Sequence, residues 1–439
     1  MQPAADEGGA GAAGTRRGLD RSLGLGQVTA SGVGIIVGAG IYVLVGEVTA
    51  LAGARVWIAF VLAAVLSALT GLSYAELASM FPKAGAEFEY SRHAYPPWVA
   101  FLVGWVMFGG LIVAAAAVAL GFGRYAGRFV AVSPVVAAIV MLCVVSAVAW
   151  SGVRRSARLT VALSLVQVGG LLFVIAIGAP HVGEVDLMSG DGGSGGLIAA
   201  AALVFFAFIG FDEVITLAEE TRNPSRTVPM ALFLALGISA VLYIGVAVAA
   251  VSVLGAGALG ASERPLADVI DHVLGGGGAD VLAAIAMLAT TNTTLLCITA
   301  TSRLQYGMAD AGALPPVFAA LGPRSRAPRV AIGVSLVVSV AFVLIGDLSV
   351  IAGVTDFAIY LVFVAVNVAV VVLRFRMPDH PRPFRVPLAI GRVPVPPLCG
   401  LVAVLVVLPA LRWEAIALGA VLCGAGGVAY VAVGRRARA

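Results

Sequence analysis

Two stretches of the sequence combine long apolar runs with residues that interrupt a helix. The first stretch, from Thr29 to Tyr42, carries glycines at positions 32, 34, 38 and 40. The second, from Ala201 to Val214, contains an aromatic run, then Gly210, and then the acids Asp212 and Glu213. A glycine destabilises a helix interior by up to about 1 kcal/mol, and a charge within hydrocarbon is costly and usually faces a cavity. Both stretches are therefore predicted to be broken helices.

A broken helix frees backbone groups that a continuous helix would use internally. After the first break, from about Ile41, the helix would present free N–H groups and the positive end of its dipole, which suit a carboxylate. Free carbonyls before each break would suit an ammonium group. Together the two breaks would match a zwitterion such as an amino acid. The alternatives are that the glycines serve close helix packing and that the two acids lie nearer the membrane surface.

The composition indicates an integral membrane protein. The chain has 439 residues, of which 61% are hydrophobic and 11% charged, with a mean hydropathy of +1.05. Ordinary globular domains are about 25% charged, so a soluble fold would lack the polar residues to cover this much apolar surface. The net charge of +4 does not indicate nucleic-acid binding, because the basic residues fall in the predicted loops.

Apolar runs of about 20 residues, enough to cross a bilayer, recur along the whole chain. The predicted spans are 24–50, 55–80, 98–121, 131–151, 158–178, 196–220, 228–254, 279–309, 328–346, 350–375, 394–411 and 413–434. The polar segment 1–23 is predicted to be a disordered tail and 435–439 a second tail. The segment 261–278 is predicted to form a short external helix.

The basic residues predict the orientation. Twelve spans place both ends of the chain on one side, and that side holds 22 of the 27 Lys and Arg residues. The positive-inside rule then predicts that both termini are cytoplasmic. The expected location is the cell membrane, with the protein spanning it many times.

The spans group into two halves. Five lie in 24–178 and five in 196–375, with two additional spans in 394–434. An odd number per half makes any repeat inverted, and in transporters built this way interrupted spans at matching positions point to the binding site. Here the first helix of each half carries the interruption.

Four motifs, in order, carry a family resemblance. The chain resembles permeases of the amino acid–polyamine–organocation superfamily, closest to bacterial relatives of the cationic amino acid transporters. The resemblance covers about residues 20 to 390. The motifs are Gly38-Ala-Gly-Ile-Tyr-Val43; Tyr74-Ala-Glu-Leu77 with Phe81-Pro-Lys-Ala-Gly85; Phe205-Phe-Ala-Phe-Ile-Gly-Phe-Asp212 followed by Glu219-Glu-Thr-Arg-Asn-Pro224; and Thr290-Thr-Asn-Thr293 leading to Gly312-Ala-Leu-Pro315.

The resemblance implies an all-α LeuT-type fold, a 5+5 inverted repeat with discontinuous helices 1 and 6. It implies that the substrate carboxylate meets backbone amides, and that the substrate amine meets backbone carbonyls. The amides are those of Gly38, Ala39, Gly40 and Ile41, and the carbonyls those near Ile36, Phe205, Ala207 and Phe208. Phe206 and Ile209 are expected beside the substrate.

The resemblance also names candidates for coupling and gating. Asp212 matches a position where relatives carry a proton-sensing acid, and Glu219 begins a helix end where relatives form gate contacts. Gln167 replaces a lysine of proton-coupled relatives and cannot exchange a proton near neutral pH, although it could bridge helix 1 by hydrogen bonds. A coupling proton would then depend on Asp212, Glu213 or Glu76. Thr290 and Thr291 occupy the region where sodium-coupled members of the wider fold bind an ion.

Other functions stay open at this level. A polyamine or amine transporter, or a non-transporting nutrient sensor, would keep the same pocket. A membrane enzyme is disfavoured because the four histidines fall in predicted loops, without a paired metal-binding motif. No cofactor, metal or nucleic acid is expected, and the expected partners are an amino acid and the lipid bilayer, with a coupling proton left open. The expected oligomeric state is a monomer.

Overall fold

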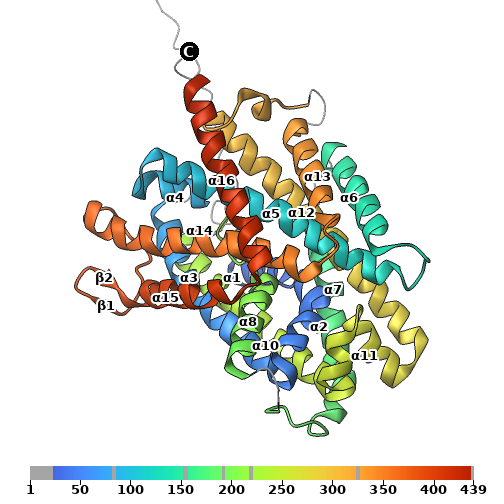
Figure 1. The fold of residues 1–439 in the computed structure, drawn as a ribbon. Helices are drawn as coiled ribbons and strands as arrows, with labels where there is room; N and C mark the ends of the chain where they lie inside the picture. The colour runs from blue at the N-terminus through green and yellow to red at the C-terminus, as the bar shows by residue number, and fades with distance from the viewer. Residues whose placement is uncertain are drawn as a thin grey trace, which may run out of the picture.

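The computed structural model describes residues 23–81, 86–151, 157–189, 193–216, 221–322 and 327–436, and it is almost entirely helical (Figure 1). The α-helices are α1 Leu25–Ile36, α2 Gly40–Ala52, α3 Val56–Met80, α4 Ala86–Ala94, α5 Pro97–Ala126, α6 Pro134–Ser151, α7 Ala157–Gly178, α8 Gly193–Val204, α9 Glu213–Thr216, α10 Pro224–Ala261, α11 Pro265–Leu274, α12 Gly276–Asp310, α13 Arg329–Val343, α14 Leu348–Arg376, α15 Val395–Val407 and α16 Trp413–Arg436. The 3-10 helices are η1 Gly53–Arg55, η2 Ala179–His181, η3 Phe205–Phe208, η5 Pro316–Ala319 and η6 Leu408–Ala410, and one antiparallel hairpin pairs β1 Ala389–Ile390 with β2 Val393–Pro394.

Nine segments within the described residues are long and apolar enough to cross a membrane. One of them, Gly40–Met80, contains both α2 and α3. Three shorter apolar helices, Leu25–Ile36, Arg329–Val343 and Val395–Ala410, accompany them. The protein is therefore a helical, multi-pass membrane protein, and each predicted span coincides with one or more helices.

Burial separates the central helices from the outer ones. In α5, 83% of the most apolar window is buried, whereas in the window of Trp413–Val433 the buried share is only 11%. α5 packs against α6, α12, α13, α14 and α16. The alanine- and glycine-rich sequence of α5 allows this, because small residues let neighbouring helices approach closely.

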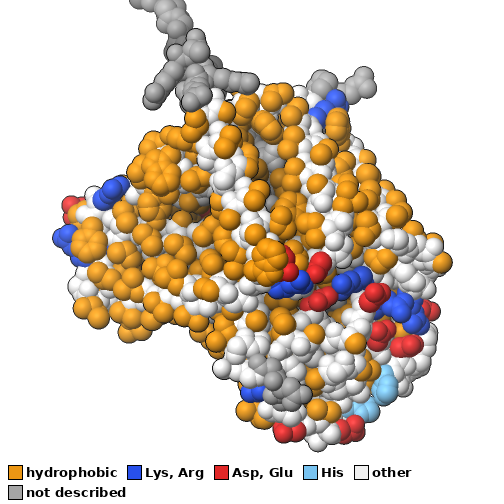
Figure 2. Space-filling model, viewed as in Figure 1, with side chains coloured by type: hydrophobic (Ala, Val, Ile, Leu, Met, Phe, Trp, Pro, Cys, Tyr) orange, Lys and Arg blue, Asp and Glu red, His pale blue; other side chains and the backbone are white. Residues whose placement is uncertain are grey.

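The outer surface has the character of a lipid-facing belt. Large hydrophobic side chains such as Val241, Val337 and Val421 are more than two-thirds exposed. Figure 2 shows this hydrophobic surface as a broad expanse with charged side chains gathered along its borders. On one border Arg412 pairs with Asp347 at 2.7 Å and with Glu414 at 3.1 Å.

The segment that precedes α1 and the segment that follows α9 lie side by side. Leu23 forms a parallel bridge with Thr221, and the Arg222 N–H donates to the Leu23 carbonyl at 2.9 Å. The predicted gate residue Glu219 and the predicted tail 1–23, except Leu23, lie outside the described residues. A short helix is present within 261–278, as predicted, and is α11.

Candidate functional site

The first stretch of interest is broken between α1 and α2. The Val37 N–H still donates to the Val33 carbonyl, but the Gly38 N–H turns back to the Ile36 carbonyl, both at 2.7 Å. The next helical bond runs from Val43 to the Ala39 carbonyl at 3.0 Å. The amides of residues 40–42 therefore precede the first bond of α2, where helix N–H groups have no acceptor within their own helix.

The second stretch is broken over a longer distance. α8 ends at Val204, η3 continues through the aromatic run, and α9 begins only at Glu213. Gly210 between them has a φ of +110°, a conformation that L side chains rarely adopt. The Gly210 N–H donates to the Asp212 carboxylate at 3.2 Å, so Asp212 stabilises the turn.

The two breaks touch each other. A Cβ atom added at Gly40 would lie 2.6 Å from the Cα atom of Ala207, and one added at Gly210 would lie 3.0 Å from the Ile35 side chain. Glycine is required at position 40 because the backbone of the other broken helix occupies the space of a side chain.

Tyr243 of α10 joins the two breaks. Its hydroxyl lies 2.7 Å from the Ile36 carbonyl oxygen and 3.0 Å from the Ala207 carbonyl oxygen, and the side chain is fully buried. These are two of the carbonyls predicted to face a substrate amine. A carbonyl oxygen has two lone pairs, so each can accept a second donor while Tyr243 stays in place.

A small cavity of about 50 Å³ lies at the junction. A cavity of this volume holds a few water molecules at most. An ordinary ligand pocket is much larger, at roughly 300 Å³ or more. Seven predicted substrate-binding residues line it: Ile36, Gly38, Ala39, Gly40, Phe206, Ala207 and Ile209. Helices α5 and α12 complete the wall with Leu111, Ala114, Val118, Thr293, Leu296 and Cys297.

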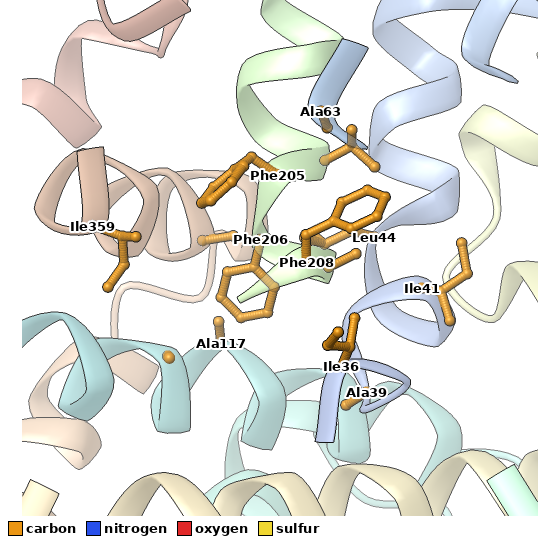
Figure 3. Close-up of a cluster of buried hydrophobic side chains, with 14 of the residues drawn as sticks. Ile36, Ala39, Ile41, Leu44, Ala63, Ala117, Phe205, Phe206, Phe208 and Ile359 are labelled. Atoms are coloured by element: carbon orange, nitrogen blue, oxygen red, sulfur yellow. The ribbon is translucent and has the colours of Figure 1, made fainter. Parts of the chain in front are cut away.

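Three predicted residues lie behind the cavity wall. Phe205 packs against Tyr360 with ring centroids 5.1 Å apart, and Phe208 packs edge-on against Tyr243 at 5.2 Å. Ile41 is fully buried at the start of α2. Figure 3 shows Phe206 extending from η3 towards Ala117 of α5.

Thr293 lines the cavity, although only Thr290 and Thr291 of the same motif were predicted as functional residues. Its hydroxyl accepts the Ala39 N–H at 3.1 Å, and the side chain lines the cavity. The predicted Thr290 and Thr291 instead donate to helix carbonyls, at 2.8 Å to Ala286 and 2.7 Å to Met287. The spacing of threonines in a helix does not by itself tell which one faces a neighbour.

Gln167 contacts α2 through its main chain. The Tyr42 hydroxyl donates to the Gln167 carbonyl at 2.6 Å, while both polar atoms of the buried Gln167 side chain lack a partner among the described residues. The hydrogen bonds that we expected from its side chain are therefore absent there. One turn earlier, Ser164 packs so closely on Gly34 that an added Cβ would lie 2.1 Å from its hydroxyl.

Three acids gather near the breaks. Glu213 lines the cavity and Asp212 is 8% exposed. The third is Glu87 in the short helix α4, which the sequence reasoning did not identify. Burial, and secondarily the Asp212 carboxylate, raises the pKa of Glu87 from 4.5 to about 7.

Glu76 lies in a different environment from these acids. It forms a two-point ion pair with Arg374, with Nε 3.0 Å from Oε1 and Nη2 2.5 Å from Oε2. The Val386 N–H also donates to Glu76 at 2.7 Å. Arg374 and the Val386 amide therefore occupy the Glu76 carboxylate, and Glu76 does not line the cavity.

Comparison with known proteins identifies the family by its sequence. Residues 23–423 match the model of an amino acid permease family. The chain is 29% identical to the branched-chain amino acid permease BcaP of Bacillus subtilis, over 91% of this chain and 90% of that protein.

Two further relatives have different substrates in their names. A methylthioribose transporter of Bacillus subtilis is 30% identical over 87% of this chain and 86% of its own length. The vacuolar cationic amino acid transporter 4 of Arabidopsis thaliana is 31% identical over 82% of this chain and 64% of its own length. The names of the relatives therefore agree on transport and differ in what is transported.

Proposed function

The chain belongs to the amino acid permease family, and on that premise we propose that it carries amino acids across the membrane by alternating access. The match covers residues 23–423 and so includes both broken helices. The proposed transport path runs through the junction of the two breaks. We propose a LeuT-type 5+5 inverted repeat formed by 24–178 and 196–375, with two further spans in 394–434 and both termini cytoplasmic.

The substrate carboxylate is proposed to meet the start of α2. The amides of Gly40 and Ile41 precede the first hydrogen bond of this helix, and the positive end of the helix dipole favours an anion there. The amides of Gly38 and Ala39 already donate to Ile36 and to Thr293. A carboxylate would therefore bind the helix start first and would compete with the Thr293 hydroxyl for Ala39.

The substrate ammonium is proposed to meet the carbonyls that Tyr243 joins. The Ile36 and Ala207 oxygens lie within hydrogen-bonding distance of one hydroxyl, so a small cation could be shared between them. Glu213, which lines the cavity, would supply a carboxyl oxygen as a further acceptor. Phe206 and Ile209 would then contact the substrate side chain.

The size of the cavity supports a cycle with a closed state. A volume of about 50 Å³ is too small for an amino acid, so the broken helices must separate before a substrate enters. In transporters with inverted repeats, one bundle rocks against the other around a fixed central site. The close contact between Gly40 and Ala207 is the observation that carries this proposal, because it makes the two breaks one site.

A ligand screen tests the proposal. The purified protein is heated with each standard amino acid and with common amines, because a ligand that binds the folded state raises the apparent melting temperature. We expect a subset of amino acids to stabilise the protein and to be taken up by liposomes containing it. Stabilisation without uptake would indicate a nutrient sensor instead.

Glu213 also supports a second candidate, transport of an amine that lacks a carboxylate. A cation needs an acid near the pocket, and Glu213 is in its wall. Stabilisation by amines and not by amino acids would favour this candidate.

A further inference from the structure

A second cavity, of about 400 Å³, lies where α14 ends. Four arginines line it, with a single carboxylate: its walls are Arg374, Pro378, Asp379, His380, Arg382, Arg385 and Arg392. This cavity shares no lining residue with the one at the broken helices. Its excess of positive charge predicts an anionic ligand.

Arg374 supplies a buried donor that is still available. Its Nε and Nη2 atoms contact Glu76, and Nη2 also donates to the Val386 carbonyl at 3.1 Å. The remaining Nη1 atom has no partner among the described residues, although the side chain is only 2% exposed. A buried donor without an acceptor is destabilising, so a ligand oxygen here would supply the missing acceptor.

Arg382 holds the wall in place. Its Nη2 atom donates to the carbonyls of Leu373 and Met377, both at 2.9 Å, at the C-terminal end of α14. Desolvation lowers the pKa of Arg382, and neighbouring Arg374 and Arg385 lower it further against the opposite effect of Glu76. Three further arginines share the lining with Arg382, against the one carboxylate of Asp379 among the described lining residues.

The outer wall is formed by exposed arginines. Arg385 and Arg392 are both exposed, and neither forms an ion pair within the part of the chain that the structure describes. They can move to meet a ligand that enters from outside. Asp379 is the only acid among the described lining residues, and it can accept a hydroxyl donor next to the bound anion.

Apolar side chains beside the cavity indicate where the ligand comes from. Leu388 and Ile390, at the β1–β2 hairpin, are 75% and 79% exposed, and Phe375 in the last turn of α14 is 52% exposed. At the left edge of Figure 2, near the end of α14 in Figure 1, basic side chains lie directly beside hydrophobic ones. Exposed aliphatic groups next to arginines are typical of segments that lie at the surface of an anionic membrane.

We propose that the cavity at the end of α14 binds the phosphate of an anionic phospholipid headgroup, with Arg374, Arg385 and Arg392 as donors. The hairpin residues Leu388 and Ile390 enter the adjoining acyl region. Because Arg374 also pairs with Glu76 of α3, a bound lipid stabilises the contact between α3 and α14.

Short-chain lipids test the proposal on the purified full chain. The probes are dioctanoylphosphatidylglycerol, dioctanoylphosphatidylcholine and inorganic phosphate, with affinity measured by native mass spectrometry and by thermal shift. We expect phosphatidylglycerol to bind at least tenfold more tightly than phosphatidylcholine. The double variant Arg385→Gln/Arg392→Gln should lose that tenfold preference, because it removes two charged donors to the phosphate.

A matched control removes the same charge elsewhere. Arg92 has a 55% exposed side chain and Arg226 is exposed, and the orientation predicted from the sequence places both on the same side as the cavity. Arg92→Gln/Arg226→Gln should therefore retain the preference. Equal loss in both double variants, or no loss in either, would overturn the proposal.

A third variant separates a lipid from a soluble anion. Leu388→Ser/Ile390→Ser should weaken phosphatidylglycerol binding several-fold while leaving the weak binding of inorganic phosphate unchanged. If inorganic phosphate binds as tightly as phosphatidylglycerol, or if the serine variant keeps its lipid affinity, the cavity binds a soluble anion and the assignment to a lipid is wrong.

Discussion

At the scale of single residues, the glycine at the helix break is the most sharply defined feature. Gly40 has no room for a Cβ atom, because the Ala207 backbone lies 2.6 Å from where it would be. Gly40→Val should therefore push the two breaks apart and abolish uptake while the protein still reaches the membrane. The measurement is uptake of the ligand found in the screen, with the amount of folded protein determined by size-exclusion chromatography.

Gly169→Val is the matched control. Gly169 is exposed, and nothing lies within 4 Å of its added Cβ, so uptake should stay near normal. Normal uptake by Gly40→Val would mean that the junction is not the transport site.

Thr293 allows a second test at this scale. Thr293→Val removes the acceptor of the Ala39 N–H, a hydrogen bond worth about 1 kcal/mol. A substrate carboxylate then no longer competes with Thr293 for this amide, so the apparent KM for uptake should fall about fivefold. Thr299→Val is the control, because the Thr299 hydroxyl only donates to the Leu295 carbonyl of its own helix. Equal KM values for the two variants would rule out a role for Thr293 in binding.

Glu87 predicts a pH dependence of stability. Its pKa rises from 4.5 to about 7 on folding, so the folded state retains the proton over a range in which the unfolded state has lost it. Stability from this group is complete below pH 4.5, falls as the pH rises towards 7, and levels off above 7. Asp212 and Glu213 are the acids near Glu87, so the melting temperature reflects all three.

The Glu87 prediction is measured as the melting temperature between pH 4.5 and 8. Glu87→Gln should flatten part of the decline, whereas Glu89→Gln in the same helix should keep it. A wild-type protein with no decline over this range would contradict the raised pKa.

At the scale of elements, the apolar runs predicted the helices well, and the glycines predicted where two of them break. Runs of about 20 apolar residues have few alternatives to a spanning helix. The sequence did not predict α4, η3 or the β1–β2 hairpin, because segments this short lack a run long enough to produce a clear pattern. Glu87 and Leu388 were missed for that reason.

Contacts between elements were also beyond the sequence. Thr290, Thr291 and Thr293 lie within one turn of α12, and only packing decides which of them faces Ala39. Glu76 was predicted as a coupling candidate, and the sequence could not reveal its ion-pair partner because Arg374 lies 298 positions away. Most of the predicted substrate residues near the breaks do line one cavity, because the breaks themselves bring them together.

At this scale we predict that Tyr243 stabilises the contact between the two broken helices. Its hydroxyl joins the carbonyls of both breaks, so Tyr243→Phe should lower the melting temperature by several degrees, as expected for the loss of about 1–3 kcal/mol when a buried acceptor is left unpaired. Tyr430→Phe, in an exposed tyrosine of α16, should leave it unchanged. The same shift in both variants would indicate that Tyr243 does not hold the breaks together.

At the scale of the whole molecule, charged side chains line two separate cavities of a largely apolar bundle. One is the junction of the broken helices, with Glu213 in its wall, and the other is the arginine cavity at the end of α14. Buried polar groups within a membrane are costly and usually functional. Composition could predict the membrane, but it could not predict which polar residues would meet, since that depends on packing between distant helices.

Energy coupling is a property of the entire transport cycle, and Gln167 bears on it directly. An amide cannot exchange a proton near neutral pH, and the Gln167 side chain has no partner within the described residues. We therefore expect uptake into liposomes to follow the substrate gradient and to ignore an imposed pH gradient. Uptake is measured with the interior at fixed pH and the exterior one unit lower, against equal pH on both sides. Accumulation driven by the gradient would contradict this, and its loss in Glu87→Gln would assign coupling to the acids around Glu87 and Asp212.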